Sequence, residues 1–525
     1  MNKHLSTLVK IVQDGNGWKT NGEKIAVSKT SRTAGGAYER VRNAVEYEEE
    51  HLLRRNAILR ILGRRRMMEA DESIESRGEA VLKELIWAKY LPNKEVPAKK
   101  IKAVDAVLAK YDALFERLPE SGSERQDMEA WLLDVLSTEV EYTIEPPKSS
   151  EALATMMFDA MRQHITWGVN TDLDEAEKDL LTYIAIHRTL LKSNLATLRF
   201  RVFMLYVPNW HRPSAHTKRE VEARLLSLIR TIESKIRHPY ADQLYRLMRR
   251  FALVFWTIED VVKEKPDEAM DILRDDDRLK RYIGAAIGER YKTFRKKLYR
   301  VVGRAVIFLF LTKMLLALLL EIPYDLYVLG NLETVPLAIN VIFHPLFLAL
   351  IGLTVRIPAA RNTALVVDHV RKLVHDDSAT METVFKVKKP WTQGTLGMIF
   401  SSLYGLTFVL SYGFMAWVLT VVLHFNILST ILFLFFFSLV TFFGIKIRQS
   451  VRELLVLDRQ GGIIGALFDF FMLPVVRVGR WISLQSPKVN VFIFFLDFIV
   501  EAPFKLAIEM IEGWVAFIRE KKEEL

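Results

Sequence analysis

The sequence predicts an all-α protein in which a helical domain is followed by a membrane domain of four spanning helices. Charge is the first reason: residues 1–300 hold 53 basic and 46 acidic side chains, whereas residues 301–525 hold only 20 and 17. The second is the stretch from Pro390 to Ile445, which contains no Asp, Glu, Lys or Arg. The third is that apolar residues before about residue 300 recur with a helical period, without an alternating strand pattern.

Composition alone suggests an ordinary soluble chain. The 525 residues carry a formal net charge of +10 and are 26% charged, and such a length corresponds to about three domains. The absence of cysteine excludes disulfides, thiolate metal sites and a cysteine nucleophile. The position of the charges along the chain is therefore more informative than their total.

The first 36 residues are predicted to be a flexible segment. Residues 21–36 are rich in Lys, Ser, Thr and Gly, a composition that buries little apolar surface. The apolar run before them is short, so we expect no signal peptide there.

Residues 37–300 are predicted to form a cytoplasmic domain of helices. Buried faces are expected on two helices, carried by Val221, Leu225, Leu228, Ile229, Ile232 and Ile236, and by Leu244, Met248, Phe251, Phe255, Ile258 and Val262. We attribute the second, heptad-like seam to packing within a bundle rather than to a coiled coil. Capping boxes predict helix starts at Ser123, Asp172 and Thr217. No helix-breaking residue separates residues 276–300 from the apolar segment that follows, which predicts one helix running from the cytoplasm into the membrane.

Positive charge gathers in the part of this domain next to the membrane. Residues 181–300 carry 26 basic and 14 acidic side chains, an arrangement typical of a surface lying against an anionic cytoplasmic leaflet. Nucleic acid is the other common partner of such a surface, but we find no recognition motif and predict no nucleic-acid binding. The predicted lipid-headgroup contacts are Arg295, Lys296, Lys297, Arg300 and Arg304.

Residues 301–460 are predicted to form the transmembrane domain. About 20 apolar residues cross the hydrocarbon core, and the predicted spans are residues 304–328, 335–355, 395–423 and 427–445. The loop between the first two spans holds only acidic charges, whereas Lys and Arg precede span one and follow spans two and four. Because basic loops remain cytoplasmic, both termini are predicted to be cytoplasmic. Compact loops and the lack of cysteine favour a prokaryotic inner membrane.

Residues 461–525 are predicted to form amphipathic helices that lie at the interface or re-enter the membrane. Asp497, Glu501, Lys505 and Glu509 recur every fourth residue, which places them on one helix face, and such a polar stripe is typical of an interfacial helix. A fifth and a sixth span remain the alternative, although basic residues in the connection between them would then be extracellular.

One polar site is predicted inside the membrane. Lys313 lies roughly 13 Å along the helix from Arg304, and Asn340 and His344 share a face of span two at a similar depth. Ionisable groups at that depth are candidates for an ion path or a proton relay. Lys313 could instead extend toward the cytoplasm, and an acidic partner requires Glu321 or Asp325 to turn inward.

Motifs for catalysis are missing from the sequence. It has no phosphate-binding Gly-Lys-Ser/Thr loop, no His-Glu-x-x-His and no Gly-x-Ser-x-Gly, so we expect neither an enzyme nor a cofactor. The run Asp275–Asp277 is interpreted as a helix cap rather than as a metal site.

Three functions remain open. The first is a membrane-anchored scaffold that binds protein partners, or copies of itself, through the helical domain. The second is an ion channel or transporter with a polar site around Lys313 and His344. The third is lipid handling or membrane remodelling by the C-terminal helices.

Overall fold

The protein is almost entirely helical in the part of the chain that the structure, a computed structural model, describes. The described residues are 3–15, 22–45, 52–67, 76–119, 121–167, 173–358, 360–375, 383–385, 395–456 and 463–485, with single residues at 510 and 514. The predicted all-α class is confirmed. The chain divides into two compact units: a helical unit, which contains residues 2–165 and 171–248, and a span-bearing unit, which contains residues 166–170 and 249–490.

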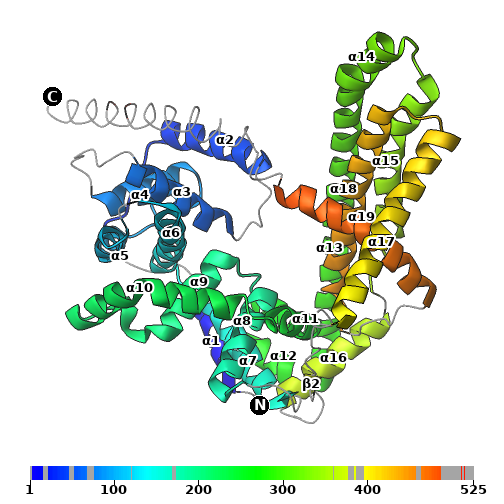
Figure 1. The fold of residues 1–525 in the computed structure, drawn as a ribbon. Helices are drawn as coiled ribbons and strands as arrows, with labels where there is room; N and C mark the ends of the chain where they lie inside the picture. Colours follow the sequence, from blue (N-terminus) through cyan, green and yellow to red (C-terminus); the bar gives the residue numbers. More distant parts are fainter. Residues whose placement is uncertain are drawn as a thin grey trace. The chain divides into compact units, whose positions relative to one another are not determined.

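The helical unit is built from ten α-helices among its described residues (Figure 1). They are α1 (Lys3–Asp14), α2 (Lys29–Val45), α3 (Leu53–Met67), α4 (Arg77–Trp87), α5 (Lys99–Glu116), α6 (Ser123–Ile144), α7 (Lys148–His164), α8 (Glu175–Leu190), α9 (Leu195–Tyr206) and α10 (Ala215–Ile236). A short 3-10 turn, η2 (Pro208–His211), precedes α10. Apolar side chains of α3 to α6, α9 and α10 form one continuous core.

Buried charges in this core are paired. Lys110 donates to Glu139 and to the Trp210 carbonyl, and Tyr111 donates to the other oxygen of Glu139 at 2.6 Å. Burial lowers the pKa of Lys110, although Glu139 opposes that shift. Since every one of these groups has a partner, the cluster ties α5 to α6 and to the turn before α10.

α6 begins at the predicted Ser123, the predicted Asp172 lies outside the described residues, and α10 begins before the predicted Thr217. The side chains that accept a hydrogen bond from the first turn are Asp174 for α8 and Ser214 for α10, and the residue before α6 is Gly122. The Thr217 prediction was wrong because Thr217 supplies the amide that Ser214 caps. A capping residue stands outside the helix, and sequence spacing alone located it three residues too late.

The span-bearing unit contains the remaining helices, and α11 (Ala241–Glu264) crosses the boundary between the units. They are α12 (Ala269–Arg274), α13 (Asp276–Leu316), the π turn η3 (Ala317–Glu321), α14 (Ile322–Tyr324), the π turn η4 (Asp325–Leu329), α15 (Thr334–Thr354), α16 (Ala360–His375), α17 (Thr395–Trp417), the π turn η6 (Val418–Val422), α18 (Ile427–Arg452) and α19 (Ile463–Gln485). The predicted buried seam of α11, from Leu244 to Val262, is confirmed.

Among the described residues, four helices are long and apolar enough to cross a membrane: residues 276–329, 334–354, 402–422 and 427–452. They match the four predicted spans, and the predicted turn at residues 424–426 is confirmed, since His424 has a positive φ and Asn426 caps α18. α13 is one continuous helix of 41 residues, which confirms the predicted run from residue 276 into the first span.

Helices α13, α15 and α18 form the centre of this bundle (Figure 1). α15 packs on both α13 and α18, and two glycines permit that close approach. A β-carbon on Gly352 would lie 2.6 Å from Val302 Cγ1, and one on Gly444 would lie 2.7 Å from Ile351 Cδ1. α19 packs on α18 and α17 and runs across them rather than along them (Figure 1).

Two three-residue strands depart from the purely helical prediction. β1 (Ile165–Trp167) and β2 (Thr383–Phe385) pair in a two-stranded sheet. Both are rich in β-branched and aromatic residues, which suit a strand, but they are too short for an alternating pattern to be recognised.

The first half of α13 is clamped by polar contacts to its neighbours. Arg290 makes a bidentate ion pair with Asp260 of α11, at 2.8 and 2.7 Å. Asn362 of α16 donates to Tyr291 of α13 and to the Leu454 carbonyl, and accepts from the Val456 amide. One buried amide side chain therefore joins α13, α16 and the segment after α18.

Candidate intramembrane polar site

Four residues of the first span face the interior at intervals of four. Lys313, Ala317, Glu321 and Asp325 are all buried. In a regular α-helix each step of four residues advances about 40° beyond a full turn, so such a row would drift around the helix. The π turns η3 and η4 counteract that drift, because their i→i+5 bonds make each turn wider.

Pro323 lies between these two π turns. Proline has no amide hydrogen and its ring collides with the carbonyl four residues earlier. The wider turns relieve that conflict, and they also direct Glu321 and Asp325 inward. Pi turns of this kind occur frequently at functional sites.

Helices α15 and α18 supply the other side chains. Asn340 and His344 are one turn apart on α15 and both are fully buried. On α18, Asn426 caps the helix by accepting from the Ser429 amide at 2.8 Å, and Ser429 follows on the buried face.

The side chains join in one hydrogen-bonded cluster. Lys313 Nζ donates to Asn340 Oδ1 at 2.7 Å, and Asn340 Nδ2 donates to Glu321 Oε2 at 2.7 Å. Ser429 Oγ donates to the same carboxylate oxygen at 2.9 Å. Asn340 is thus an amide bridge between a buried cation and a buried carboxylate. We call Lys313, Glu321, Asn340, His344 and Ser429 the polar cluster.

The cluster extends toward the 424–426 turn. Asn426 Nδ2 donates to Asp325 Oδ1 at 2.7 Å, while its own side-chain oxygen caps the helix at Ser429. Residue by residue, the contacts run from Asp325 through Asn426, Ser429, Glu321 and Asn340 to Lys313. This polar row covers the half of the bundle between its middle and that turn.

His344 lies between two carbonyl oxygens. Nδ1 is 3.1 Å from the Asn340 carbonyl and Nε2 is 3.0 Å from the Phe433 carbonyl. A neutral imidazole has one N–H, so only the protonated ring donates to both acceptors. His344 therefore adds a third titratable group, and its ring also packs on Phe433.

One polar atom in the cluster has no hydrogen-bond partner among the described residues. It is Glu321 Oε1, and the Glu321 side chain is fully buried. The Lys313 ammonium also lies over the Phe436 ring, 4.3 Å from its centroid, a favourable cation–π arrangement.

The other half of the bundle is closed by apolar packing. Beyond Lys313, the buried side chains of α13, α15 and α18 form a hydrophobic cluster that comprises Leu298, Val302, Leu309, Leu348, Ile351, Phe436, Val440 and Ile447. We call it the apolar plug. The polar row thus lies on the side of the 424–426 turn, where a second, smaller apolar cluster of Leu419, Phe425 and Phe433 also packs, whereas the apolar plug lies on the side of the basic loops.

The structure brings the three predicted site residues together and adds to them. Lys313, Asn340 and His344 are within one network, and Glu321 and Asp325 do turn inward. Sequence reasoning missed Ser429 and Asn426. The signal for them was the Asn-x-x-Ser motif at the start of an apolar helix, where Asn426 caps the helix at Ser429.

The other predicted sites are placed as follows. Arg295, Lys296, Lys297, Arg300 and Arg304 are all exposed on α13. Asp275 accepts from the Asp277 and Arg278 amides, as a helix cap does. The predicted stripe Asp497, Glu501, Lys505 and Glu509 lies outside the described residues.

α19 reaches into the depth of the bundle. Gly479 fits against the Ser438 backbone and the Phe442 side chain, and Ser438 is eight residues from Lys446, or about 12 Å along α18. Arg477 lies over the Tyr404 ring of α17, 5.2 Å from its centroid.

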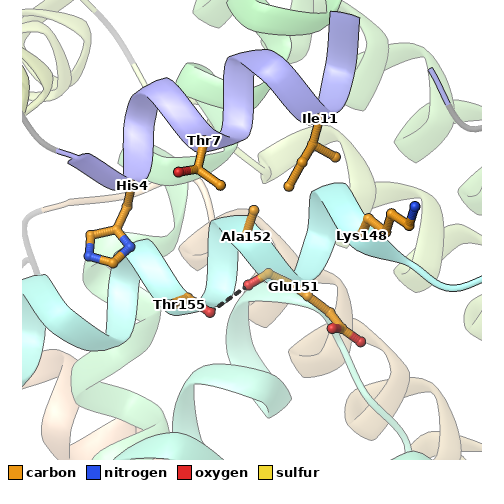
Figure 2. Close-up of a pocket in the computed structure, with 7 residues that line it drawn as sticks. All are labelled: His4, Thr7, Ile11, Lys148, Glu151, Ala152 and Thr155. Carbon is orange, nitrogen blue, oxygen red and sulfur yellow. Dashed lines mark hydrogen bonds between the residues drawn. The ribbon is translucent and has the colours of Figure 1, made fainter. Parts of the chain in front are cut away.

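A pocket in the helical unit offers no comparable chemistry. It lies between α1 and α7, and Figure 2 shows the side chains that line it: His4, Thr7, Ile11, Lys148, Glu151, Ala152 and Thr155. The Thr155 hydroxyl bonds to its own helix, at the Glu151 carbonyl, and His4 pairs with Asp159 at 2.9 Å. These groups serve helix packing.

Comparisons with known proteins found no matching family model, no matching curated protein and no matching solved structure.

Proposed function

We propose that this chain is a membrane protein that moves a small ion through the polar cluster. The observation that supports the proposal is the fully buried Lys313–Asn340–Glu321 bridge, which is connected by polar side chains to one end of the bundle. It develops the channel or transporter alternative that the sequence suggested.

Burying two opposite charges in a membrane bundle is costly. Insertion scales assign at least about 2.5 kcal/mol to each charged side chain near the bilayer centre. A hydrophobic set of similar volume often stabilises a fold as well or better. The presence of both charges therefore supports a role beyond packing, and ion movement is a common use of such groups.

The apolar plug means that this arrangement is closed on the side of the basic loops. Ion movement requires the plug to open, and α13 is suited to control it. The same helix carries Lys313 and the clamped residues Arg290 and Tyr291. Because α13 is one continuous helix, movement of α11 or α16 would displace the part of α13 that contributes to the apolar plug.

The experiment is flux through the full-length protein in lipid vesicles. Gradients of H⁺, Na⁺ and K⁺ are imposed in turn, and wild type is compared with Lys313→Leu. We expect flux of one ion, reduced at least tenfold by the substitution. The matched control is Thr312→Val, one residue away, where the hydroxyl is exposed and bonds only to its own helix. Absence of flux for all three ions would refute the proposal.

A second function, a membrane-anchored scaffold, is supported by the helical unit. That unit has its own large core and its own buried ion pairs, so it can present a stable surface to protein partners or to another copy of the chain. Crosslinking followed by pull-down of the full-length protein tests it, and repeated recovery of no partner counts against it.

We further propose that the basic loops face the cytoplasm and contact anionic lipids. Five exposed basic residues lie just before the first span: Arg295, Lys296, Lys297, Arg300 and Arg304. Each cation near an anionic leaflet contributes about 1 kcal/mol. A prokaryotic inner membrane would supply such a leaflet.

A further inference from the structure

The two oxygens of the buried Glu321 carboxylate have unequal surroundings. Oε2 accepts from Asn340 at 2.7 Å and from Ser429 at 2.9 Å. Oε1 accepts from no group among the described residues, although the side chain is fully buried. A buried oxygen without a donor is costly, so Oε1 is suited to bind something that arrives and leaves.

The surroundings of Oε1 select against a metal ion. A hard cation such as Ca²⁺ takes six to eight oxygen ligands. Two other side-chain oxygens of the cluster are already engaged, because Ser429 Oγ donates to Oε2 at 2.9 Å and Asn340 Oδ1 accepts from the Lys313 ammonium at 2.7 Å. A metal ion would therefore lack ligands and would stand beside a fixed positive charge, whereas a proton needs only one lone pair and no extra space.

We infer that the ion which this site binds is a proton, taken up at Glu321 Oε1 and exchanged with Lys313 under the control of the Asn340 amide. The inference rests on the proposed function and names its substrate. The Asn340 amide accepts at its oxygen and donates at its nitrogen, so it holds the ammonium and the carboxylate together without passing a proton between them. Transfer requires the amide side chain to move aside.

The proton balance closes in three steps. A proton from water on the side of the 424–426 turn forms an O–H bond at Glu321, and the charge of the Lys313–Glu321 pair rises from zero to one. The Lys313 ammonium then loses a proton to water on the other side when the apolar plug opens. Finally the Glu321 proton passes to the neutral Lys313 amine, which restores the ion pair. One proton has then crossed.

The groups facing Glu321 are suited to this cycle. α13 contributes Lys313 and α15 contributes His344, while Asp325 lies one turn beyond Glu321. From α18 come Ser429 and Asn426, which are uncharged. The cluster thus pairs a single ammonium with a single carboxylate through one amide, and His344 and Asp325 are the additional groups that could hold a proton.

The test separates protons from other cations in vesicles that contain the full-length protein. A pH gradient with an internal pH dye measures proton flux, and Na⁺ and K⁺ gradients are applied at constant pH. We expect proton flux alone, reduced at least tenfold in Glu321→Gln, which keeps size and shape. The matched control is Glu289→Gln, an exposed carboxylate of α13 outside the apolar span, for which flux should equal wild type.

The outcomes are distinguishable. Flux of Na⁺ or K⁺ without H⁺ overturns this inference and leaves the proposed function standing, whereas no flux of any ion overturns both. Unchanged proton flux in a folded Glu321→Gln protein also overturns the inference.

A second measurement does not depend on transport. A hydrophobic carbodiimide reacts with protonated carboxyls in apolar surroundings, and mass spectrometry locates the adduct. We expect modification at Glu321 that becomes faster as pH falls, because the reagent needs the protonated form. Modification that is absent at all pH values in wild type would contradict proton uptake at Oε1.

Discussion

Gly352 of α15 lies directly against Val302 of α13, and a β-carbon on Gly352 would stand 2.6 Å from Val302 Cγ1. The valine is β-branched and has little freedom to turn away. The contact therefore sets how closely the two central helices approach, at the edge of the apolar plug.

Replacing Gly352 with Leu should separate α13 from α15. Overpacking of this kind costs about 1–3 kcal/mol, which thermal unfolding of the detergent-solubilised protein would detect. The control is Gly303→Ala, next to Val302 on α13, where a β-carbon meets open space and stability should stay within about 1 kcal/mol of wild type. Equal stability of both variants would show that the glycine contact does not set the helix spacing.

Lys313 and Glu321 should be energetically coupled through Asn340. Either Lys313→Met or Glu321→Gln leaves one buried charge without its opposite, and breaking a buried pair costs about 3–5 kcal/mol. The double variant should lose clearly less than the sum of the single losses. A double-mutant cycle on the free energy of unfolding measures this, and simple additivity would mean that the amide bridge transmits no interaction.

Asn362 should hold the segment after α18 in place. Asn362→Leu removes the acceptor of the Val456 amide and the donors to Leu454 and Tyr291. Leaving buried partners unsatisfied costs about 1–3 kcal/mol each, and hydrogen exchange at Val456 should become faster. Asn362→Asp retains an acceptor for that amide, so protection of Val456 should persist. If both variants exchange alike, the side-chain acceptor is not what protects Val456.

The helical unit should lose stability in mild acid because of His187. Burial, assisted by the positive charge of Arg201, holds the pKa of His187 well below 6.5. Below pH 6.5 the His187 imidazole is protonated in the unfolded chain but stays neutral in the folded unit. Stability contributed by the neutral ring is complete above that pH and declines by up to about 1.4 kcal/mol per pH unit as pH falls toward the folded pKa.

A comparison of unfolding at pH 7.5 and 5.5 measures the effect. His187→Phe should show a smaller loss at pH 5.5 than wild type, while replacement of the exposed His216 of α10 by Phe should behave like wild type. A loss of equal size in all three proteins would assign the acid sensitivity to other groups.

The absence of cysteine makes the predicted orientation easy to test. Asn331→Cys and His424→Cys place a single thiol in the exposed turns that join spans one to two and three to four, and Arg448→Cys places one on the last turns of the fourth spanning helix. A membrane-impermeant thiol reagent should label the first two in intact cells and the third only after permeabilisation. The reverse pattern would invert the topology and place the outer end of the polar row in the cytoplasm.

Several parts of the structure were predictable from local patterns. Four spans, the turn at 424–426 and the unbroken α13 follow from runs of uncharged residues and the absence of helix breakers. Helical spacing also predicted the buried faces of α10 and α11. Spacing failed at the start of α10, where Ser214 rather than Thr217 is the cap, because a capping residue is defined by backbone geometry.

By itself the sequence determined the all-α class, the number of apolar spans and the candidate residues Lys313, Asn340 and His344, since these depend on properties that each segment carries alone. Only the tertiary structure decided which groups meet. The π turns around Pro323 rotate Glu321 inward, and packing of α15 between α13 and α18 places Asn340 between Lys313 and that carboxylate. Such contacts join residues on three helices. The hydrophobic pattern within one helix does not determine how that helix is rotated against its neighbours.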